Sequence, residues 1–324
     1  MKSFHLLLLL FLSFKVSAQW MDVGGGLTHS VSPYALVNAL IVHKDTLWVN
    51  GGFNTAGSDT GYHTTVKWAN GSWTDVVPWN DSEGNINCFS NYNDGKLYIG
   101  GQFNPTVNFS TGHFVGRWNG NAWESYSYGV PAGGGAYITT ICPYRNKLYI
   151  GGLQLLQVCD SVSTCINIDD IAAWNGSHWE NAGGGPGGYV IDKMLVYNGE
   201  LIAGGQIAHF PEYYSIARWN DSTWRPVGRF GVWGYGLAGV NDLALDTLRN
   251  LMYASGLFFF ADGKTGNCIA QFDGRRWEFI GDSSLVINVP NLHVYHNELY
   301  VSGILPSVLA NGDTVSGLIK WNGK

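Results

Sequence analysis

A short motif recurs along this chain, consisting of an aromatic residue, a polar turn and a Trp five positions after the aromatic. Intact copies are Trp68–Trp73, Trp118–Trp123, Trp174–Trp179, Trp219–Trp224 and Phe272–Trp277. A further copy is divided between the ends of the chain. If the chain is cleaved after Ala18, the terminal Trp321-Asn322-Gly323-Lys324 continued by Gln19-Trp20 restores the same spacing. A repeat cut in register across the two termini predicts a closed ring.

A second motif, an apolar strand that ends in glycine, recurs out of phase with the first. Its copies are LWVNGGF (47–53), LYIGGQF (97–103), LYIGGLQ (148–154), LIAGGQI (201–207), MYASGLF (252–258) and LYVSGIL (299–305), with the last glycine of each pair at 52, 101, 152, 205, 256 and 303. Periods of roughly 50 residues, each with room for about four strands, are typical of propeller blades. The sequence therefore predicts an all-β, single-domain, six-bladed β-propeller.

One repeat shows how a blade is expected to form. Residues 194–197 are apolar and predict the first strand, and Asn198-Gly199 is a favoured two-residue hairpin turn. Residues 201–203 predict the second strand, 216–219 the third and 223–227 the fourth. We expect the glycine pairs to lie where backbones crowd near the axis, and the Trp residues to pack between neighbouring sheets.

The divided motif assigns the N-terminal segment a place in this ring. Residues 286–322 supply three strands of the last blade, and Trp20–Val23 supplies its fourth. Without that strand the last blade would expose an unpaired edge. We therefore expect the N-terminal strand to close the ring, which needs no residue beyond Lys324.

Residues 1–18 have the pattern of a secretory signal peptide. A basic start at Lys2 precedes an apolar run from Leu6 to Phe14, and small residues stand at Val16 and Ala18. The run is shorter than the roughly 20 residues that span a bilayer. We predict a mature chain of residues 19–324 that is secreted, periplasmic or held at the cell surface, without membrane insertion.

The charge balance bears on the partners of the chain. The formal net charge is −6, and removing Lys2 and Lys15 with the signal peptide gives −6 − 2 = −8. No run of Lys and Arg occurs, which disfavours nucleic acid and anionic membranes as partners. We expect a monomer that needs no cofactor.

The five cysteines all lie in the predicted mature chain, where export would expose them to oxidising conditions. Cys159 and Cys165 flank one loop and are the preferred disulfide. Cys88 and Cys142 fall in equivalent predicted strands and form a weaker candidate pair. The odd number leaves at least one free thiol, which we expect to be buried. No spacing suggests zinc.

Together these motifs resemble a known group of repeats. The combination of LYxGGxF, IAxWNG and a following Wxx(V/L)G is similar to kelch/galactose-oxidase-like β-propeller repeats of secreted bacterial proteins, and also to repeats of fungal cell-surface marker proteins. The resemblance covers the mature chain and implies the propeller fold, with little information about activity. Bacterial proteins of this kind often carry a C-terminal sorting domain, which this chain lacks up to Lys324, so we do not expect surface anchoring by that route.

Aromatic residues in the loops are the main candidates for ligand binding. Propellers usually bind on the face where the loops between second and third strands emerge with the linkers between blades. Aromatics there can stack on sugar rings or anchor peptide side chains, although they can also simply cover the ends of the sheets. The candidate ligand-binding residues are Tyr34, Trp79, Tyr137, Tyr189, Trp233, Tyr235 and Tyr214.

Signatures of catalysis are mostly missing from the sequence. No G-x-S-x-G elbow, H-E-x-x-H helix or phosphate-binding loop occurs, and no register of metal ligands is found. The leading interpretation is therefore a binding module for a glycan or protein ligand. One alternative is an enzyme acting on polysaccharide with paired carboxylates in the central funnel, such as Asp170 and Glu212. Another is a purely structural or assembly role.

Overall fold

A computed structural model describes most of the repeat-containing chain. The described residues are 23–30, 35–76, 85–103, 113–125, 136–161, 164–209, 212–228, 230–231, 239–257, 259–260, 269–281, 287–308, 312–321 and 323. Within these ranges all regular secondary structure is β-strand, and every strand pair is antiparallel. No helix long and apolar enough to cross a membrane is found among them.

The strands form a series of sheets that follow one another along the chain. The first sheet contains β2 (Leu36–His43), β3 (Thr46–Ala56), β4 (Asp59–Ala69) and β5 (Ser72–Asp75), and β1 (Leu27–Thr28) also pairs with β3. The second contains β6 (Asn85–Asn91), β7 (Leu97–Phe103), β8 (His113–Trp118) and β9 (Trp123–Ser125). The third contains β10 (Tyr137–Tyr144), β11 (Lys147–Leu153), β14 (Ile171–Trp174) and β15 (Trp179–Asn181). The pair Leu153–Val190 joins it to the fourth, so that the two together form one nine-stranded sheet.

The later sheets repeat this order. The fourth contains β16 (Gly188–Tyr197), β17 (Glu200–His209), β19 (Ile216–Trp219) and β20 (Trp224–Pro226), with β18 (Glu212–Tyr213) on β17. The fifth contains β22 (Gly239–Asp246), β23 (Leu251–Leu257), β25 (Ile269–Phe272) and β26 (Trp277–Phe279), and the sixth β27 (Ile287–Tyr295), β28 (Glu298–Val308) and β29 (Thr314–Trp321). A short hairpin is formed by β12 (Gln157–Ser161) with β13 (Thr164–Asn167). A further two-stranded sheet is formed by β21 (Phe230–Gly231) and β24 (Phe259–Phe260), which β22 and β23 separate in the chain.

The fourth sheet confirms the strand assignment made from one repeat. Its strands pair in chain order, with Leu195 opposite Ile202 and Ala203 opposite Ala217. The hairpin turn is also as expected, because Asn198 and Gly199 both have positive φ, at 50° and 77°. The first two strands are longer than predicted, at Gly188–Tyr197 and Glu200–His209, because hydrogen bonding continues beyond the apolar residues. The third strand has the predicted bounds, and the fourth is shorter, at Trp224–Pro226.

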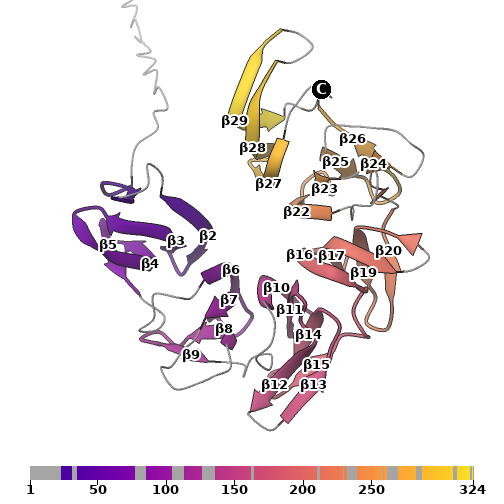
Figure 1. Ribbon diagram of the computed structural model, residues 1–324, viewed down its shortest axis with the longest axis horizontal. Helices are drawn as coiled ribbons and strands as arrows, with labels where there is room; N and C mark the ends of the chain where they lie inside the picture. Colours follow the sequence, from indigo (N-terminus) through magenta and orange to yellow (C-terminus); the bar gives the residue numbers. More distant parts are fainter. Residues whose placement is uncertain are drawn as a thin grey trace, which may run out of the picture.

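The sheets surround a common centre in a propeller-like arrangement (Figure 1). Their first strands lie nearest that centre, and β6, β10, β16, β22 and β27 each contact the first strand of the sheet before them. The hydrophobic core is divided among the joints between sheets. One cluster, for example, joins Tyr149 and Ile171 of the third sheet to Met194 and Leu201 of the fourth. Burial between sheets, and not within a single central core, therefore stabilises the fold.

The glycine pairs are explained by two different close approaches. At Gly204 an added Cβ would lie 2.9 Å from Val240 of the next sheet, whereas at Gly205 it would lie 2.1 Å from the Val190 carbonyl oxygen of the same sheet. The first glycine thus permits neighbouring sheets to pack, and the second permits the first two strands to pack. Crowding is confirmed as their cause.

One glycine position from the sequence comparison is wrong by a residue. In the first sheet the equivalent of Gly152 is Gly51 and not Gly52, because Gly51 pairs with Val37 as Gly152 pairs with Ile138. An added Cβ on Gly51 would lie 1.8 Å from the Leu36 carbonyl oxygen, which is the same approach as at Gly205. Asn50 occupies the place of the first glycine of the pair.

Paired aromatics of the repeat hold several sheets to the one before them, although the buried Trp179 Nε1 of the third sheet has no hydrogen-bond partner among the described residues. Trp219 and Trp224 lie directly opposite each other in the ladder, with ring centroids 5.3 Å apart. The Trp224 indole Nε1 donates to the Ala182 carbonyl of the third sheet at 2.7 Å. Equivalent bonds run from Trp123 to the Val76 carbonyl and from Trp277 to the Val227 carbonyl. The predicted packing of Trp residues between sheets is confirmed, with this hydrogen bond as an added component.

A second set of hydrogen bonds joins the sheets at their turn end, where the hairpins between first and second strands lie. Tyr92, Tyr144 and Tyr197 each donate a hydroxyl hydrogen bond to a turn carbonyl of the following sheet, namely Asn146, Gly199 and Asn250. Arg249 of the fifth sheet similarly donates to the Asn297 carbonyl. These bonds run in the opposite direction along the chain from the indole bonds.

The first sheet has a partner of another kind for its Trp. Trp73 Nε1 donates to the Val23 carbonyl at 2.9 Å. Val23 follows Trp20 by three residues, as Val76 follows Trp73 and Ala182 follows Trp179. Val23 therefore occupies the place that the residue after the fourth strand of the preceding sheet takes at the joints of Trp123, Trp224 and Trp277.

The outer face of β2 is exposed in a way that other first strands are not. Leu40 is 64% exposed, whereas the residues at the same register in the fourth and fifth sheets, Met194 and Leu243, are 4% and 3% exposed. Figure 1 shows the first and sixth sheets at the two ends of the arc. The exposure of Leu40 marks the end of this arc.

Candidate functional site

The structure describes three of the seven aromatic residues proposed from the sequence as ligand-binding. Tyr137 and Tyr189 begin or nearly begin the inner strands β10 and β16, at the end of the sheets opposite the turn end. Tyr214 precedes β19 in the fourth sheet. The other four, Tyr34, Trp79, Trp233 and Tyr235, lie outside the described residues.

Tyr137 and Tyr189 are brought together by the pairing of the third and fourth sheets. Leu153 pairs with Tyr137 on one side and with Val190, the neighbour of Tyr189, on the other. Two strand spacings separate the two backbones, which is about 10 Å. The backbones of Tyr137 and Tyr189 therefore lie near each other at the end of the sheets opposite the turn end, and we call these two residues the tyrosine pair.

A β-bulge exposes Tyr189. Gly188 pairs with Ile207 and Val190 with the adjacent Gln206, so Tyr189 is the extra residue of the strand. Bulges commonly redirect a side chain, and Tyr189 is 46% exposed while Tyr137 is half-buried. An exposed aromatic next to a half-buried one gives a surface on which a sugar ring or an apolar side chain can pack.

Tyr214 supports this surface from below. It is 6% exposed and packs in the cluster that joins the third and fourth sheets. Its hydroxyl donates to the Pro186 carbonyl at 3.3 Å, in the linker that leads to Tyr189. Its environment is therefore that of a residue that positions the linker.

Polar side chains at equivalent bulges of the inner strands surround the axis. Asn87 in β6 and Thr139 in β10 are each the extra residue of a bulge. Asn87 Nδ2 donates to the Ile138 carbonyl of the third sheet at 2.8 Å, and Thr139 donates to the Ile191 carbonyl of the fourth. At these two bulges the polar group is a hydrogen-bond donor that ties one sheet to the next.

Asp192 occupies the same bulge in the fourth sheet. A carboxylate cannot donate a hydrogen bond, so the ionised side chain cannot repeat the bond that Asn87 and Thr139 make. Burial raises the pKa of Asp192 to about 7. A proton is therefore retained on this side chain well above the usual range of an aspartate.

A charged pair lies one residue further along the neighbouring inner strands. Lys193 Nζ is 3.4 Å from Asp242 Oδ1, and the other oxygen of Asp242 accepts the Leu292 backbone N–H at 2.8 Å. Burial raises the pKa of both Cys88 and Cys142 to about 12, against the opposing charge of Lys193. Both cysteines are free thiols, so they do not form the weaker disulfide considered above, and Cys268 lies outside the described residues.

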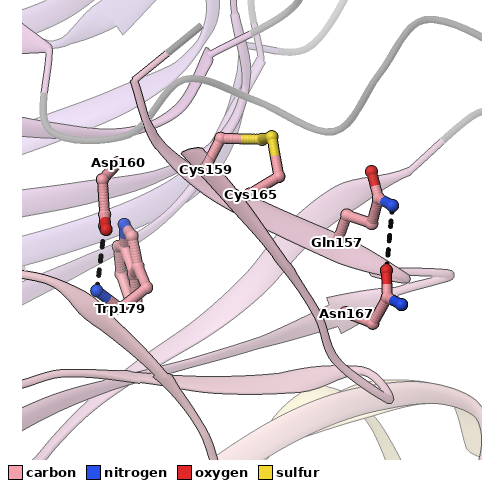
Figure 2. Close-up of a disulfide and its surroundings, with 6 residues drawn as sticks. All are labelled: Gln157, Cys159, Asp160, Cys165, Asn167 and Trp179. Carbon is pink, nitrogen blue, oxygen red and sulfur yellow. Dashed lines mark hydrogen bonds between the residues drawn. A yellow bond between two sulfur atoms is a disulfide. The ribbon is translucent and has the colours of Figure 1, made fainter. Parts of the chain in front are cut away.

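The predicted disulfide between Cys159 and Cys165 is present, with an S–S distance of 2.09 Å. It links β12 to β13 in a hairpin inserted between the second and third strands of the third sheet, where the sequence predicted only a loop (Figure 2). Asp160 Oδ1 accepts the Trp179 backbone N–H at 2.9 Å, and Gln157 donates to Asn167 across the hairpin. The disulfide and the Gln157 bond lie within the hairpin, and the Asp160 bond joins the hairpin to β15 of the sheet.

Of the two carboxylates suggested for catalysis, the structure describes the side chain of Asp170 but not that of Glu212, so the pair stays a prediction. Asp170 is buried, and its Oδ1 accepts the Leu155 backbone N–H at 2.9 Å. Burial raises its pKa to about 7. Glu212 lies on β18 of the fourth sheet. Among the described residues no group of three His, Cys, Asp or Glu side chains is placed to hold a metal ion.

Comparison with known proteins supports the fold alone. No protein family matches the sequence, and no curated protein matches it. Among solved structures the chain is similar to YjhT, with 13% identity, a TM-score of 0.50, and coverage of 90% of this chain and 99% of that one. It is also similar to virginiamycin B lyase from Staphylococcus aureus, with 9% identity, a TM-score of 0.49, and coverage of 88% and 83%.

A third similar structure is the extracellular domain of a putative hybrid two component system from B. thetaiotaomicron. It has 12% identity and a TM-score of 0.43, and the match covers 92% of this chain and 40% of that one. At 13% identity the likeness to YjhT concerns the fold alone and not any activity.

Proposed function

We propose that the protein is an exported β-propeller that binds a glycan or a protein ligand on its loop face. The tyrosine pair is the observation on which the proposal depends. A bulge directs Tyr189 towards solvent beside Tyr137, while Tyr214 holds the linker beneath them. The other four aromatics named from the sequence, Tyr34, Trp79, Trp233 and Tyr235, extend this face in the proposal.

The polar groups near the axis favour binding over catalysis. Asn87, Thr139 and Asp242 are engaged in hydrogen bonds between sheets, so they hold the ring together. Asp192 is the exception, because burial raises its pKa to about 7. If the protein is instead an enzyme acting on polysaccharide, Asp192 is the residue whose replacement should abolish turnover.

A screen for both binding and turnover tests the proposal. We expect one of a set of glycans and cell-envelope polymers to bind without forming products, and Tyr189→Ala and Tyr137→Ala each to weaken binding at least tenfold. Tyr295→Ala is the matched control, since Tyr295 is 56% exposed but lies at the turn end. If a polymer is cleaved and Asp192→Asn abolishes the cleavage, the protein is an enzyme and the binding proposal is wrong. If no polymer or envelope protein binds, a structural role is favoured.

We also propose that the ring has six blades and that residues 19–22 complete the sixth. Two observations support this arrangement. Trp73 bonds the Val23 carbonyl as other Trp residues bond the preceding sheet, and the 64% exposure of Leu40 requires a cover that Met194 and Leu243 already have.

Thiol labelling distinguishes a closed ring from an open one. In a closed ring Leu40→Cys should be protected from a thiol reagent, whereas Leu248→Cys, on an exposed turn, should react at once. The native thiols Cys88 and Cys142 should remain silent because burial raises their pKa to about 12. Equal labelling at positions 40 and 248 would refute closure.

A further inference from the structure

The joint between the first and second sheets departs from the others at the turn end. Tyr144 and Tyr197, each at the end of a first strand, bridge to a turn carbonyl of the next sheet. His43 has the same register in the first sheet, since it pairs with Thr46 as Tyr144 pairs with Lys147. Its Nδ1 instead contacts Asn91 Oδ1 at 2.7 Å, so the His43 side chain reaches only β6, the adjacent first strand of the second sheet. A shorter side chain thus replaces the tyrosine that spans the other joints.

A pocket of about 340 Å³ lies where that tyrosine side chain is missing. His43, Trp48 and Lys67 line it from the first sheet, and Asp94 and Trp118 line it from the second. This volume is within the range of sites for small molecules. The pocket opens at the turn end and is therefore separate from the tyrosine pair at the loop end.

The charge of the pocket is opposite to that of the chain as a whole. Lys44, Lys67 and Lys96 line it together with a single carboxylate, Asp94, while the chain carries a net charge of −6. Asp94 is already occupied, because its oxygens accept the Tyr98 hydroxyl and the Lys96 backbone N–H, both at 3.0 Å. A positive pocket on an acidic protein favours an anionic ligand.

Glu124 also interacts electrostatically with Lys96, but its carboxylate is hydrogen-bonded within the second sheet. Arg117 donates to it at 2.5 Å and Asn119 at 2.9 Å, and these hydrogen bonds lower the pKa of Glu124. It therefore remains ionised and bonded to its own sheet. The lysines that line the pocket have no ion pair with a carboxylate among the described residues.

Aromatic rings form the wall beside these charges. The rings of Trp48 and Trp118 are 5.2 Å apart and at 65° to each other, and Lys67 Nζ lies 5.7 Å from the centre of each. The ammonium thus lies over both rings, one from each sheet, in cation–π contact with each. Trp118 is only partly buried, so part of its ring is accessible to a ligand.

We propose that this pocket binds one acidic sugar unit through its carboxylate and its ring. Lys67, with Lys44 and Lys96, would receive the carboxylate, and the accessible part of the Trp118 ring would pack on the C–H face of the sugar. The pocket is thus a second binding site, at the end of the propeller opposite the proposed loop-face site.

Titration calorimetry of the whole protein with D-glucuronate tests this site. We expect glucuronate to bind, D-glucose to bind at least tenfold more weakly, and Lys67→Met to weaken glucuronate binding at least tenfold. Lys320→Met is the matched control, because Lys320 pairs with Glu298 in the sixth sheet away from the pocket. The control should bind as the unaltered protein does.

His43→Tyr separates a binding role from a folding role. A tyrosine at this register should fill the pocket as Tyr144 fills the corresponding joint, so glucuronate binding should be lost while the thermal midpoint is unchanged or higher. The proposal is overturned if His43→Tyr still binds glucuronate, or if the unaltered protein does not bind it. If sulfate binds as tightly as glucuronate, or if an oligo-glutamate peptide binds more tightly, the assignment to a sugar acid is overturned.

Discussion

Replacing Asp192 by Asn should stabilise the protein at neutral and alkaline pH but not at acid pH. At the equivalent bulges Asn87 and Thr139 donate hydrogen bonds to the next sheet. Burial raises the pKa of Asp192 from 3.8 to about 7, so ionisation is opposed in the folded state. Asparagine carries no charge and supplies the donor that this bulge has elsewhere.

The pH range and the sign follow from proton linkage. Below about pH 4 the side chain is protonated in both the folded and the unfolded chain, and its ionisation contributes nothing. Between about pH 4 and 7 only the unfolded chain releases the proton, so the unaltered protein loses stability as the pH rises through this range. Above about pH 7 the loss is complete and constant.

The magnitude comes from the size of the pKa shift. A shift of about 3 units at about 1.4 kcal/mol per unit corresponds to at most about 4 kcal/mol. Asp192 is half-buried, so solvent screening reduces this to about 2 kcal/mol. Asp192→Asn should therefore exceed the unaltered protein by about 2 kcal/mol in free energy of unfolding at pH 8, and by little at pH 4.

Urea unfolding followed by Trp fluorescence at pH 4, 6 and 8 measures this difference. Asp45→Asn is the control, because Asp45 is an exposed hairpin residue and its effect should be the same at each pH. Asn87→Asp should produce the opposite change, a new loss of stability as the pH rises. A difference for Asp192→Asn that does not change with pH would refute the reasoning.

The remaining predictions concern the joints and the inserted hairpin. Gly205→Ala should cost about 3 kcal/mol or more, because its Cβ would lie 2.1 Å from a backbone carbonyl oxygen, whereas Gly176→Ala, with open space but a φ of 103°, should cost about 1–2 kcal/mol by urea unfolding. Trp224→Phe removes an indole donor and should lower the free energy of unfolding by about 1 kcal/mol beyond its change in packing; an unchanged midpoint would show that the bond contributes nothing. Replacing Cys159 and Cys165 by Ser should cost at most about 2 kcal/mol, because the loop they close is short, and proteolysis should become faster at the hairpin first.

Local patterns in the sequence predicted the strands and the contacts between them. The spacing of Trp219 and Trp224 placed both residues opposite each other in the ladder, because a tight turn between them leaves one register. The Cys159–Cys165 disulfide followed from their separation along one loop. The glycine pairs predicted crowding, although the paired glycines misled the comparison in the first sheet, where Asn50 replaces one glycine.

The sites depended on features that have no local signal. Tyr189 is exposed because of a bulge, which the sequence does not reveal since the same residues would also pair without one. Tyr214 was predicted to be a loop aromatic that binds ligand, but it is buried and bonded to the linker at Pro186. The position of that linker cannot be read from the residues around Tyr214. His43 was informative only when set against Tyr144 and Tyr197, a comparison that required the register of the strands.

The opposed hydrogen bonds at the joints have a mechanical consequence. At the outer edge the later sheet is the donor, through residues such as Trp224, and at the turn end the earlier sheet is the donor, through residues such as Tyr144. Tilting one sheet against its neighbour in either sense stretches one of these bonds while the other is retained. Such a joint resists tilting in both directions, so a force applied to one sheet is shared with the neighbouring sheets instead of opening a single joint.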